Sequence, residues 1–312
     1  MKLFYGLQQL KELKSNLAVT IGNFDGVHRG HQALLEKLRA NADAMSLPTL
    51  VMLFEPQSAE YFKKEEAPAR LSTLREKLHQ LAKLKVDYVC CLKFDHLLAS
   101  MPAHEFAENV IFSKLGSKYL LVGKDFRFGK KREGDFTLLE LLGRQHDCVV
   151  EHLSDFTLGD QRVSSTQIRE ALKLGQLDIA SNFLGRPYSM CGRVVRGDGR
   201  ARLLGFPTAN IKMSRQNIPL KGVYCVRVNR LGTQTLMGVA NIGCRPTLDG
   251  SQYVLEVHLF DCEESLYGEL LHVSFLHKIR DEMKFASIDA LIAAIHKDVL
   301  FAKHFMVSSS EK

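Results

Sequence analysis

The sequence predicts an α/β domain with a doubly wound parallel sheet, followed by a small antiparallel β-barrel domain with a C-terminal helix. The chain has 312 residues, which is longer than most single cores. In its first half, short apolar runs alternate with segments of helical periodicity, the pattern of βαβ units. Near Gly185 the pattern changes to short alternating runs separated by Gly, Asp and Pro, which is typical of a barrel or sandwich. We therefore expect domains at 1–184 and 185–312.

The first domain is expected to contain five strands and several intervening helices. The strands are the apolar runs at 17–22, 50–54, 88–92, 119–123 and 148–153. The helices are the periodic segments at 32–42, 72–84, 104–115, 136–146 and 163–172. Ligands of parallel sheets bind beyond the carboxyl ends of the strands. A glycine-rich segment follows the first strand and is therefore a candidate site.

The second domain is expected to contain an antiparallel barrel and one long helix. Its strands are the runs at 191–195, 222–228, 237–243, 253–260 and 270–276. The helix is expected over 287–300, with Ser287 as its cap. Its apolar stripe, predicted to pack against the barrel, consists of Ile288, Leu291, Ile292, Ile295 and Val299.

Composition indicates a globular protein of a reducing compartment. Hydrophobic residues make up 46% of the chain, and 42 basic against 35 acidic residues give a net charge of +7. This balance suits anionic partners such as nucleotides, RNA or acidic lipid, although an ordinary basic surface explains it equally well. The seven cysteines form no CxxC pair. With no signal-peptide pattern and no apolar run near ~18 residues, we expect a cytoplasmic location.

The segment "IGNFDGVHRGH" (21–31) combines glycines with two histidines, His28 and His31. A zinc site would need a third ligand, and no further His, Cys or acidic cluster stands nearby in the sequence. A helix N-terminus, by contrast, binds phosphate through free N–H groups, and glycines such as Gly22 allow close approach. A bare HxGH is a weak signal, but a strand–turn–helix context favours a phosphate site.

Two further segments allow both a structural and a functional interpretation. In "VSSTQIREAL" (163–172), Ser164 and Gln167 form a capping box, yet this helix start could also hold a phosphate. In "VGKDFRFGKKREGD" (122–135), aromatic and basic residues could bind a flat anion. Phe126 and Phe128 could equally lie in the core.

The three segments together resemble the bacterial bifunctional riboflavin kinase and FMN adenylyltransferase family, also called FAD synthetase. The second half resembles the same family through a set of motifs in the family's order: "LGFPTANI" (204–211), "KGVYCVRV" (221–228), "GVANIGCRPT" (238–247), "LEVHLFD" (255–261), "LYG" (266–268) and "KIRDEMKFAS" (278–287). The resemblance runs from about Gly22 to the last helix.

For the N-terminal domain, the resemblance implies an HxGH nucleotidyltransferase fold that moves AMP from ATP onto FMN, giving FAD and pyrophosphate. It implies that His28, His31 and Arg169 are catalytic. The residues implied to bind ATP or shape its turn are Gly22, Asn23, Asp25, Ser164, Ser165 and Thr166. The residues implied to lie near the flavin are Asp125, Phe126 and Phe128.

For the C-terminal domain, the resemblance implies a riboflavin kinase barrel that transfers the γ-phosphoryl group of ATP. Thr208 and Asn210 are implied to bind Mg²⁺ and nucleotide phosphates, Gly205 to contact ATP and Arg280 to contact flavin. Glu256 is the implied general base. Strand alternation agrees, because it turns Glu256 away from the face of Leu255, Val257 and Leu259.

The sequence departs from the family pattern at two positions. Ala201 precedes Arg202 where the family usually has Gly, which would strain the nucleotide loop if the position needs a positive φ. Ser58 stands where Pro is usual in "FEPxP", which suggests a looser loop near the first flavin site.

Three alternatives stay open from the residues. Only one module could be active, or a nucleotidyltransferase for another phosphate ester could carry a passive barrel. A third is an RNA-binding barrel, although its half shows no obvious cluster of aromatic and basic residues. We expect riboflavin, FMN and ATP as substrates, Mg²⁺ as cofactor, and neither nucleic acid nor membrane as partner. The sequence does not determine the oligomeric state.

Overall fold

The computed structural model describes residues 1–12, 16–197, 199–213, 215, 217–230, 235–247 and 250–310. The chain divides into two compact units. The first comprises residues 1–68 and 74–165, and the second comprises residues 69–73 and 166–312. Each unit carries one of the two predicted architectures.

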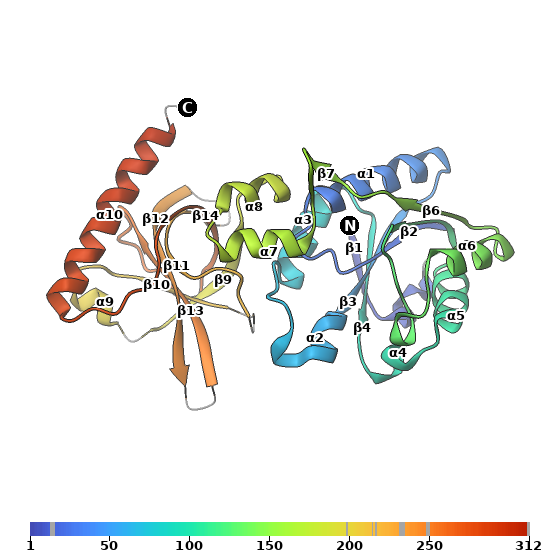
Figure 1. The fold of residues 1–312 in the computed structure, drawn as a ribbon, viewed down its shortest axis with the longest axis horizontal. Helices are drawn as coiled ribbons and strands as arrows, with labels where there is room; N and C mark the ends of the chain where they lie inside the picture. The colour runs from blue at the N-terminus through green and yellow to red at the C-terminus, as the bar shows by residue number, and fades with distance from the viewer. Residues whose placement is uncertain are drawn as a thin grey trace. The chain divides into compact units, whose positions relative to one another are not determined.

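The first unit contains a six-stranded parallel sheet in the order β1-β4-β3-β2-β5-β6 (Figure 1). The strands are β1 (Lys2–Tyr5), β2 (Leu17–Ile21), β3 (Thr49–Glu55), β4 (Tyr88–Lys93), β5 (Ser117–Gly123) and β6 (Val149–Leu153). The five predicted strands are confirmed. The edge strand β1 was not predicted, because only Phe4 in it is buried and so short a run shows no clear pattern.

Helices cover both faces of this sheet, which confirms the doubly wound fold. On one face, α1 (Arg29–Ala44) and α3 (Leu74–Lys83) pack over Ala18 and Val51. On the other face, η3 (Phe106–Lys114) and α6 (Phe136–Gln145) pack over Val19. Burial on both faces explains the uninterrupted apolar runs of the strands.

Short elements complete this unit. They are η1 (Leu7–Glu12), α2 (Ser58–Lys63), η2 (Lys64–Glu66), α4 (His96–Ser100), α5 (Ala103–Glu105), η4 (Lys130–Arg132), β7 (Thr157–Leu158) and β8 (Gln161–Arg162). The helix expected over 104–115 is realised as α5 followed by the π-helical η3. There the Leu115 N–H donates to the Val110 carbonyl, five residues back.

The second unit is built on a closed antiparallel barrel in the order β10-β13-β12-β11-β14-β9. The strands are β9 (Ser189–Val195), β10 (Ala209–Lys212), β11 (Gly222–Arg230), β12 (Thr235–Thr247), β13 (Gly250–Leu259) and β14 (Leu270–Arg280). Five of them were predicted. The short β10, inside the "GFPTANI" motif, closes the barrel between β9 and β13.

Helices α7 (Ser165–Lys173), α8 (Leu177–Leu184) and α9 (Arg200–Leu203) precede or interrupt the barrel strands. Helix α8 ends on Gly185, which has the left-handed φ of 72° common at helix C-termini. The two compact units, by contrast, divide between residues 165 and 166, so residues 166–184 belong to the same unit as the barrel.

The last helix, α10 (Ile288–Ser310), is longer than predicted. Ser287 caps it as expected, since its Oγ accepts the Ala290 N–H at 3.2 Å. The prediction for its stripe is wrong in part. Val299 packs against the barrel cluster, but Ile288 is 65% exposed, and Leu291 and Ile295 line a cavity instead of filling the core.

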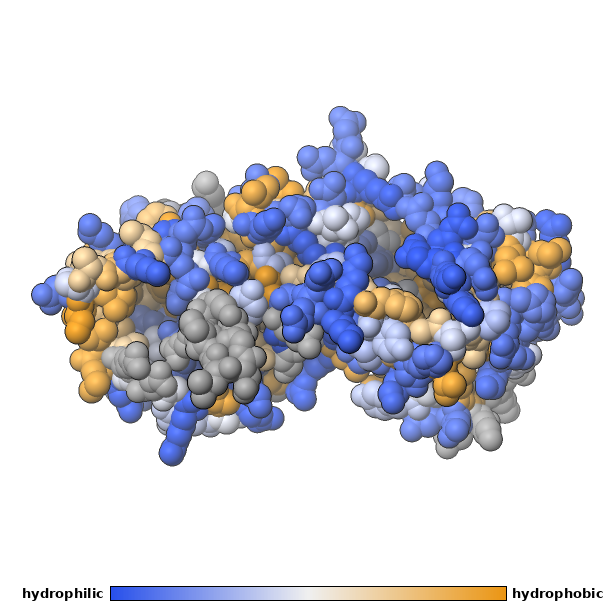
Figure 2. Space-filling model, turned by 60° about the horizontal axis from the view of Figure 1, so that its bottom comes forward, coloured by the Kyte–Doolittle hydropathy of each residue, from blue (hydrophilic) through white to orange (hydrophobic). Residues whose placement is uncertain are grey.

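The face shown in Figure 2 is mainly hydrophilic, with hydrophobic patches scattered over it. Among the helices of the described residues, none is long and apolar enough to cross a membrane. The six cysteines whose side chains are described are free thiols, at positions 90, 91, 148, 191, 225 and 262. The side chain of Cys244 lies outside the described part of the structure.

Candidate functional sites

The first cavity lies where the strand order of the parallel sheet reverses. From β2 the chain moves to β3 and β4 on one side, and then crosses to β5 on the other. Residues at the ends of β2, β5 and β6 line the cavity, among them Gly22, Gly123 and Leu153. Its volume is about 270 Å³. This is the expected ligand position in a doubly wound sheet.

The loop between β2 and α1 has a strained backbone. Phe24, Gly26 and Val27 have positive φ values of 46°, 82° and 42°. The left-handed region is unfavourable for a β-branched residue such as Val27, and such strain costs roughly 1–3 kcal/mol per residue. Phe24 and Val27 are both buried in the cluster beneath α1, which holds them in place. The loop is therefore rigidly shaped at the cavity.

The two histidines form one stacked unit at the start of α1. Their ring centroids are 3.6 Å apart with an interplanar angle of 17°. His28 is the N-cap, and its Nδ1 accepts the His31 backbone N–H at 3.3 Å. A Cβ on Gly30 would come within 3.2 Å of the His28 Nδ1, so glycine makes room for the ring. The predicted strand–turn–helix context of the HxGH motif is confirmed.

Burial, then the charges of His28 and Lys77, lower the pKa of His31 well below its usual value. This shift favours the neutral imidazole form of His31. The His31 Nδ1 is buried, and no described residue forms a hydrogen bond with it. Among the described residues, no three His, Cys, Asp or Glu side chains come together as metal ligands. The geometry favours the phosphate interpretation of this pair over the zinc interpretation.

The predicted residues of the second helix start have different environments. Ser164 lines the cavity with His28 and His31. The Ser165 Oγ donates to the Asp25 carbonyl oxygen at 2.9 Å and so ties the start of α7 to the glycine-rich loop. Thr166 and Arg169 lie on α7 in the second unit, where the Arg169 Nε donates to the Ala69 carbonyl at 2.6 Å.

The remaining predicted residues of the first domain divide into two groups. Asp125 and Phe126 line the cavity, and Asn23, Asp25 and Phe128 do not. Asp25 is buried beneath the loop. Phe128 lies in the core against Phe106 and stacks on Phe126, with centroids 5.6 Å apart. Its contribution to the cavity is to support Phe126.

An ion-pair cluster that the sequence analysis missed stands at the same cavity. Arg162 Nη2 lies 2.5 Å from an Asp125 carboxylate oxygen and 3.0 Å from one of Asp155. The hydrogen bond and charge of Arg162 lower the pKa of Asp125. The three residues are remote in sequence or separated by a hairpin, so no local motif indicated them.

An aromatic cluster was also missed. Phe54 is the second-last residue of β3, Phe94 directly follows β4, and Tyr61 and Phe62 lie on α2. Ring centroids within the cluster are 5.2–5.9 Å apart, and Phe62 is 64% exposed. Ser58 is the first helical residue of α2, a position that proline also favours. Ser58, which stands where the family usually has proline, is therefore compatible with this helix start.

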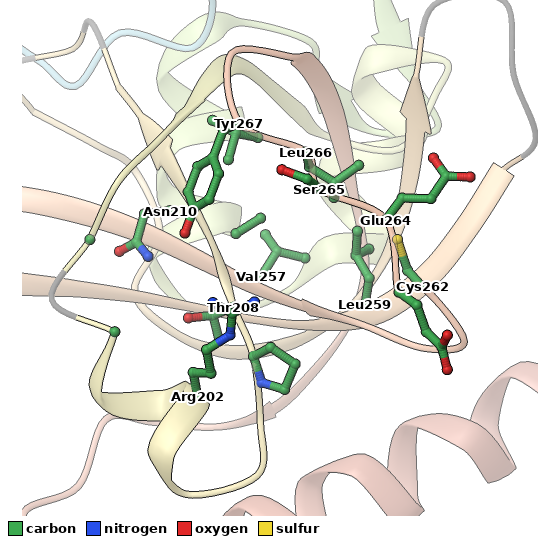
Figure 3. Close-up of a pocket in the computed structure, with 16 residues that line it drawn as sticks. Arg202, Thr208, Asn210, Val257, Leu259, Cys262, Glu264, Ser265, Leu266 and Tyr267 are labelled. Atoms are coloured by element: carbon green, nitrogen blue, oxygen red, sulfur yellow. The ribbon is translucent and has the colours of Figure 1, made fainter.

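The barrel unit carries two cavities that share Thr208 and Asn210. The first, of about 200 Å³, has polar walls that include Arg202, Glu264 and Tyr267. In Figure 3, Asn210 and Tyr267 stand on one side of it and Cys262 and Glu264 on the other. The second, of about 330 Å³, is more apolar and is lined by residues such as Phe206, Leu291 and Ile295.

Glu256 stands in a row of polar residues across three strands. It lies opposite Asn210 of β10 and opposite Asn241 of β12. All three line the larger cavity. The strand prediction is confirmed, because Leu255, Val257 and Leu259 are buried whereas Glu256 is half-buried on the other face. Asn241 was missed because its position opposite Glu256 depends on the strand register.

Arg280 lines the larger cavity but is held from behind by α10. Its Nε and Nη2 donate to the Asp298 carboxylate at 2.8–3.1 Å, and Asp298 is only 5% exposed. The guanidinium carbon also lies 5.5 Å from the Phe285 ring centroid. The pair fixes Arg280 as part of the cavity wall.

The structure removes the concern about Ala201. This residue lies in the short helix α9, and the positive φ values of the loop fall on Gly199 (70°) and Gly205 (88°) instead. Gly205 itself does not line either cavity, although its neighbours do. Ala201 therefore fits the backbone of this loop without strain.

Each unit carries a candidate site, and comparison with known proteins identifies the family of this chain as one of two-domain enzymes. Residues 10–167 match the FAD synthetase family model, and residues 184–306 match the riboflavin kinase family model. The bifunctional riboflavin kinase/FMN adenylyltransferase of Haemophilus influenzae is 47% identical over 308 residues, covering 99% of this chain and 100% of that protein. Its Escherichia coli K12 counterpart is 48% identical over 306 residues, 98% of each chain. This chain belongs to the bifunctional riboflavin kinase/FMN adenylyltransferase family.

A solved structure has the same fold over nearly its whole length. It is a crystal structure described as a macrolide-efflux protein from Streptococcus pneumoniae, with a TM-score of 0.80 and 30% identity. The match covers 96% of this chain and 97% of that chain. The shared architecture therefore includes both units.

Proposed function

We infer that this chain makes both flavin cofactors. The C-terminal barrel domain transfers the γ-phosphoryl group of ATP to riboflavin, and the N-terminal domain transfers AMP from ATP to the FMN so formed, with release of pyrophosphate. We assign the adenylyltransferase to residues 1–184 and the kinase to residues 185–312. The family-model matches at 10–167 and 184–306 and the helix end at Gly185 support this division.

In adenylyl transfer, a phosphate oxygen of FMN attacks the α-phosphorus of ATP while the bond to pyrophosphate breaks. No covalent enzyme intermediate is required, so catalysis rests on positioning and charge stabilisation. His28, His31 and the N-terminus of α1 are well placed to donate hydrogen bonds to the phosphates. Ser164, which lines the same cavity, is proposed to hold the far phosphates.

The flavin of this step is proposed to lie against aromatic side chains. Phe126 lines the cavity, and the exposed Phe62 ends an aromatic cluster on the same edge of the sheet, at the carboxyl ends of β3 and β4. Flat rings stack favourably on such surfaces. Asp125, fixed by Arg162, is a hydrogen-bond acceptor beside them.

In the kinase step, Glu256 is the general base that accepts the proton of the riboflavin 5′-hydroxyl. The hydroxyl oxygen then attacks the γ-phosphorus, and ADP leaves. The more apolar cavity suits the flavin, and the polar cavity suits the nucleotide. Arg280 is proposed to contact the flavin or its new phosphate from the wall held by Asp298.

Mg²⁺ is proposed to bind at Thr208 and Asn210, where the two cavities meet. Their hydroxyl and amide oxygens are hard donors of the kind that this ion prefers, with phosphate oxygens supplying further ligands. A Cβ on Gly197 would come within 2.6 Å of the Asn210 amide oxygen, so glycine leaves this donor room. When bound, the ion would neutralise charge on the transferring phosphates.

The observation that carries this proposal is the junction of two cavities at Thr208 and Asn210, with Glu256 directly opposite Asn210. A chromatographic time course with riboflavin, ATP and Mg²⁺ tests it. We expect FMN to rise first and FAD to follow. If FAD forms when FMN is supplied but not when riboflavin is supplied, the barrel has no kinase activity. No product from either flavin would overturn the proposal and favour another phosphate ester as substrate.

We also propose that the enzyme acts on small molecules in the cytoplasm, without nucleic-acid or membrane partners. Free thiols are typical of a reducing compartment. The described cavities, of about 200–330 Å³, suit ligands of limited size.

A further inference from the structure

His258 lies on β13, two residues beyond the proposed base Glu256. Because side chains alternate along a strand, the two residues project from the same face of β13. Both line the larger cavity of the barrel unit, together with Phe206, Thr208 and Asn210. The mechanism proposed above uses Glu256, Thr208 and Asn210, whereas His258 has no role in it.

The backbone ladder between β10 and β13 ends just before His258, at the pair Ala209 and Val257. Pro207, two residues ahead of Ala209, has no N–H and cannot donate to a ladder. Its carbonyl is therefore left to accept a hydrogen bond from a side chain or from water. This carbonyl belongs to the "GFPTANI" motif, directly before the proposed Mg²⁺ donor Thr208.

The His258 side chain supplies this hydrogen bond. Its Nδ1 lies 2.9 Å from the Pro207 carbonyl oxygen. A carbonyl oxygen only accepts hydrogen bonds, so Nδ1 carries the proton in this contact. The His258 ring also lies edge-on to the Phe206 ring, with centroids 5.7 Å apart and an interplanar angle of 82°. His258 therefore contacts the two residues that immediately precede Thr208.

The loop is held at both of its ends as well. Upstream, the Phe206 N–H donates to the Ala201 carbonyl at 2.9 Å, and the Phe206 side chain is buried. Downstream, Ala209 begins β10 and pairs with β13. His258 acts between these two ends, at the residue next to Thr208. It thus joins the strand that carries the proposed base to the loop that carries the proposed Mg²⁺ donor.

We propose that His258 is a positioning residue for phosphoryl transfer, which fixes the Thr208 hydroxyl relative to Glu256 through its hydrogen bond to the Pro207 carbonyl. The proposal rests on the riboflavin kinase function proposed above. Groups behind a metal ligand fix its orientation and thereby change metal affinity. In-line transfer also depends on the relative position of the base and the phosphates, so a small displacement of the loop lowers the rate.

The test uses the full-length protein with His258→Asn, His258→Leu and the control His296→Leu. Asn and Leu have nearly the same shape, but only Asn can donate a hydrogen bond, and its amide nitrogen stands two bonds from Cβ, as Nδ1 does. His296 is an exposed residue of α10 whose ring also lies edge-on to Phe206, with centroids 4.8 Å apart. Its substitution removes a ring contact with Phe206 and leaves the hydrogen bond to Pro207 in place.

The measurements are rates of riboflavin phosphorylation at varied Mg²⁺ and at varied riboflavin, with FMN adenylylation as the internal control. In His258→Leu we expect the half-saturating Mg²⁺ concentration to rise about three- to tenfold, the range for one ordinary hydrogen bond. The KM for riboflavin should change little. His258→Asn and His296→Leu should need nearly as much Mg²⁺ as wild type. A histidine that only fills space would not separate Asn from Leu.

Equal Mg²⁺ requirements in folded His258→Asn and His258→Leu variants would overturn the proposal. So would a raised KM for riboflavin at an unchanged Mg²⁺ requirement, which would make His258 a flavin contact. If the variants do not fold, the ¹⁵N NMR shifts of the wild-type ring decide, because they show which ring nitrogen carries the proton. A wild-type Nδ1 without a proton contradicts the proposal.

A wild-type protein that makes no FMN from riboflavin would refute the proposed kinase function instead. The NMR measurement would still test the contact between His258 and Pro207, because it needs no turnover.

Discussion

Asn210 and Glu256 lie directly opposite each other in the antiparallel ladder between β10 and β13. The pairing places the proposed base across from a residue shared by both barrel cavities. In the proposed mechanism, this site therefore contacts both the riboflavin hydroxyl that loses a proton and the phosphates of the nucleotide. The separation of roles between the units makes the proposed function testable by single substitutions.

Glu256→Gln is expected to stop FMN formation while added FMN is still converted to FAD. Loss of a general base typically costs about 10²–10⁴-fold in rate. The amide has nearly the same shape, so the barrel should stay folded. The measurement is the initial rate of each step by chromatography, with FMN adenylylation as the internal control. If this variant phosphorylates riboflavin at the normal rate, Glu256 is not the general base.

His31→Ala is expected to abolish FAD formation and to leave riboflavin phosphorylation intact. Removing one hydrogen-bond donor to the transition state typically lowers kcat by about 10²–10³-fold. The substitution also removes the ring that stacks on His28. The rate with FMN as substrate measures FAD formation, and the rate with riboflavin as substrate measures phosphorylation. His79→Ala, at an exposed histidine of α3, is the control. Loss of both activities in a folded His31→Ala protein would show that the modules are not separable.

Ala201→Gly is expected to leave riboflavin kinase activity unchanged or slightly lower. Ala201 lies in α9 without a positive φ, so glycine relieves no strain and loosens the helix by about 1 kcal/mol at most. Gly199→Ala, by contrast, forces a side chain onto a φ of 70°. It should raise the KM for ATP. A gain of kinase activity in Ala201→Gly would contradict the structure of this loop.

Asp87→Asn is expected to destabilise the first unit at neutral pH but not in acid. The Asp87 carboxylate accepts hydrogen bonds from the Thr49 N–H and Oγ1 and from Arg39 Nη2, at 2.8–2.9 Å. Burial raises the pKa of Asp87, but these partners outweigh burial and hold it below its usual value. Its stabilisation is therefore present above the unfolded pKa near about 4 and is lost as the pH falls through the folded value.

Urea unfolding at about pH 7 and about pH 3 measures this difference. We expect a loss of about 1 kcal/mol at neutral pH, the scale of a half-exposed and screened pair. The two proteins should converge at the acid end. Asp43→Asn is the control, because Asp43 is more exposed and lies farther from Arg39, at 3.5 Å. A difference that persists unchanged in acid would assign the effect to packing.

Much of the fold followed from local patterns. The run at 17–22 is apolar because β2 is buried on both faces, and alternation around Glu256 revealed which face of β13 it occupies. Edge strand β1 was missed because a short, half-exposed edge needs little apolar surface. The stripe at 288–299 was assigned wholly to packing, because periodicity cannot distinguish a core from a cavity wall.

The sequence by itself determined the two-domain architecture and, through motifs such as that of His28 and His31, the family. Those features reside in residues close along the chain, where spacing and periodicity are visible. Only the tertiary structure decided that Asn241 lies opposite Glu256 and that Arg162 binds Asp125. Strand register and helix packing bring these residues together across long stretches of sequence, and neither is encoded in local composition.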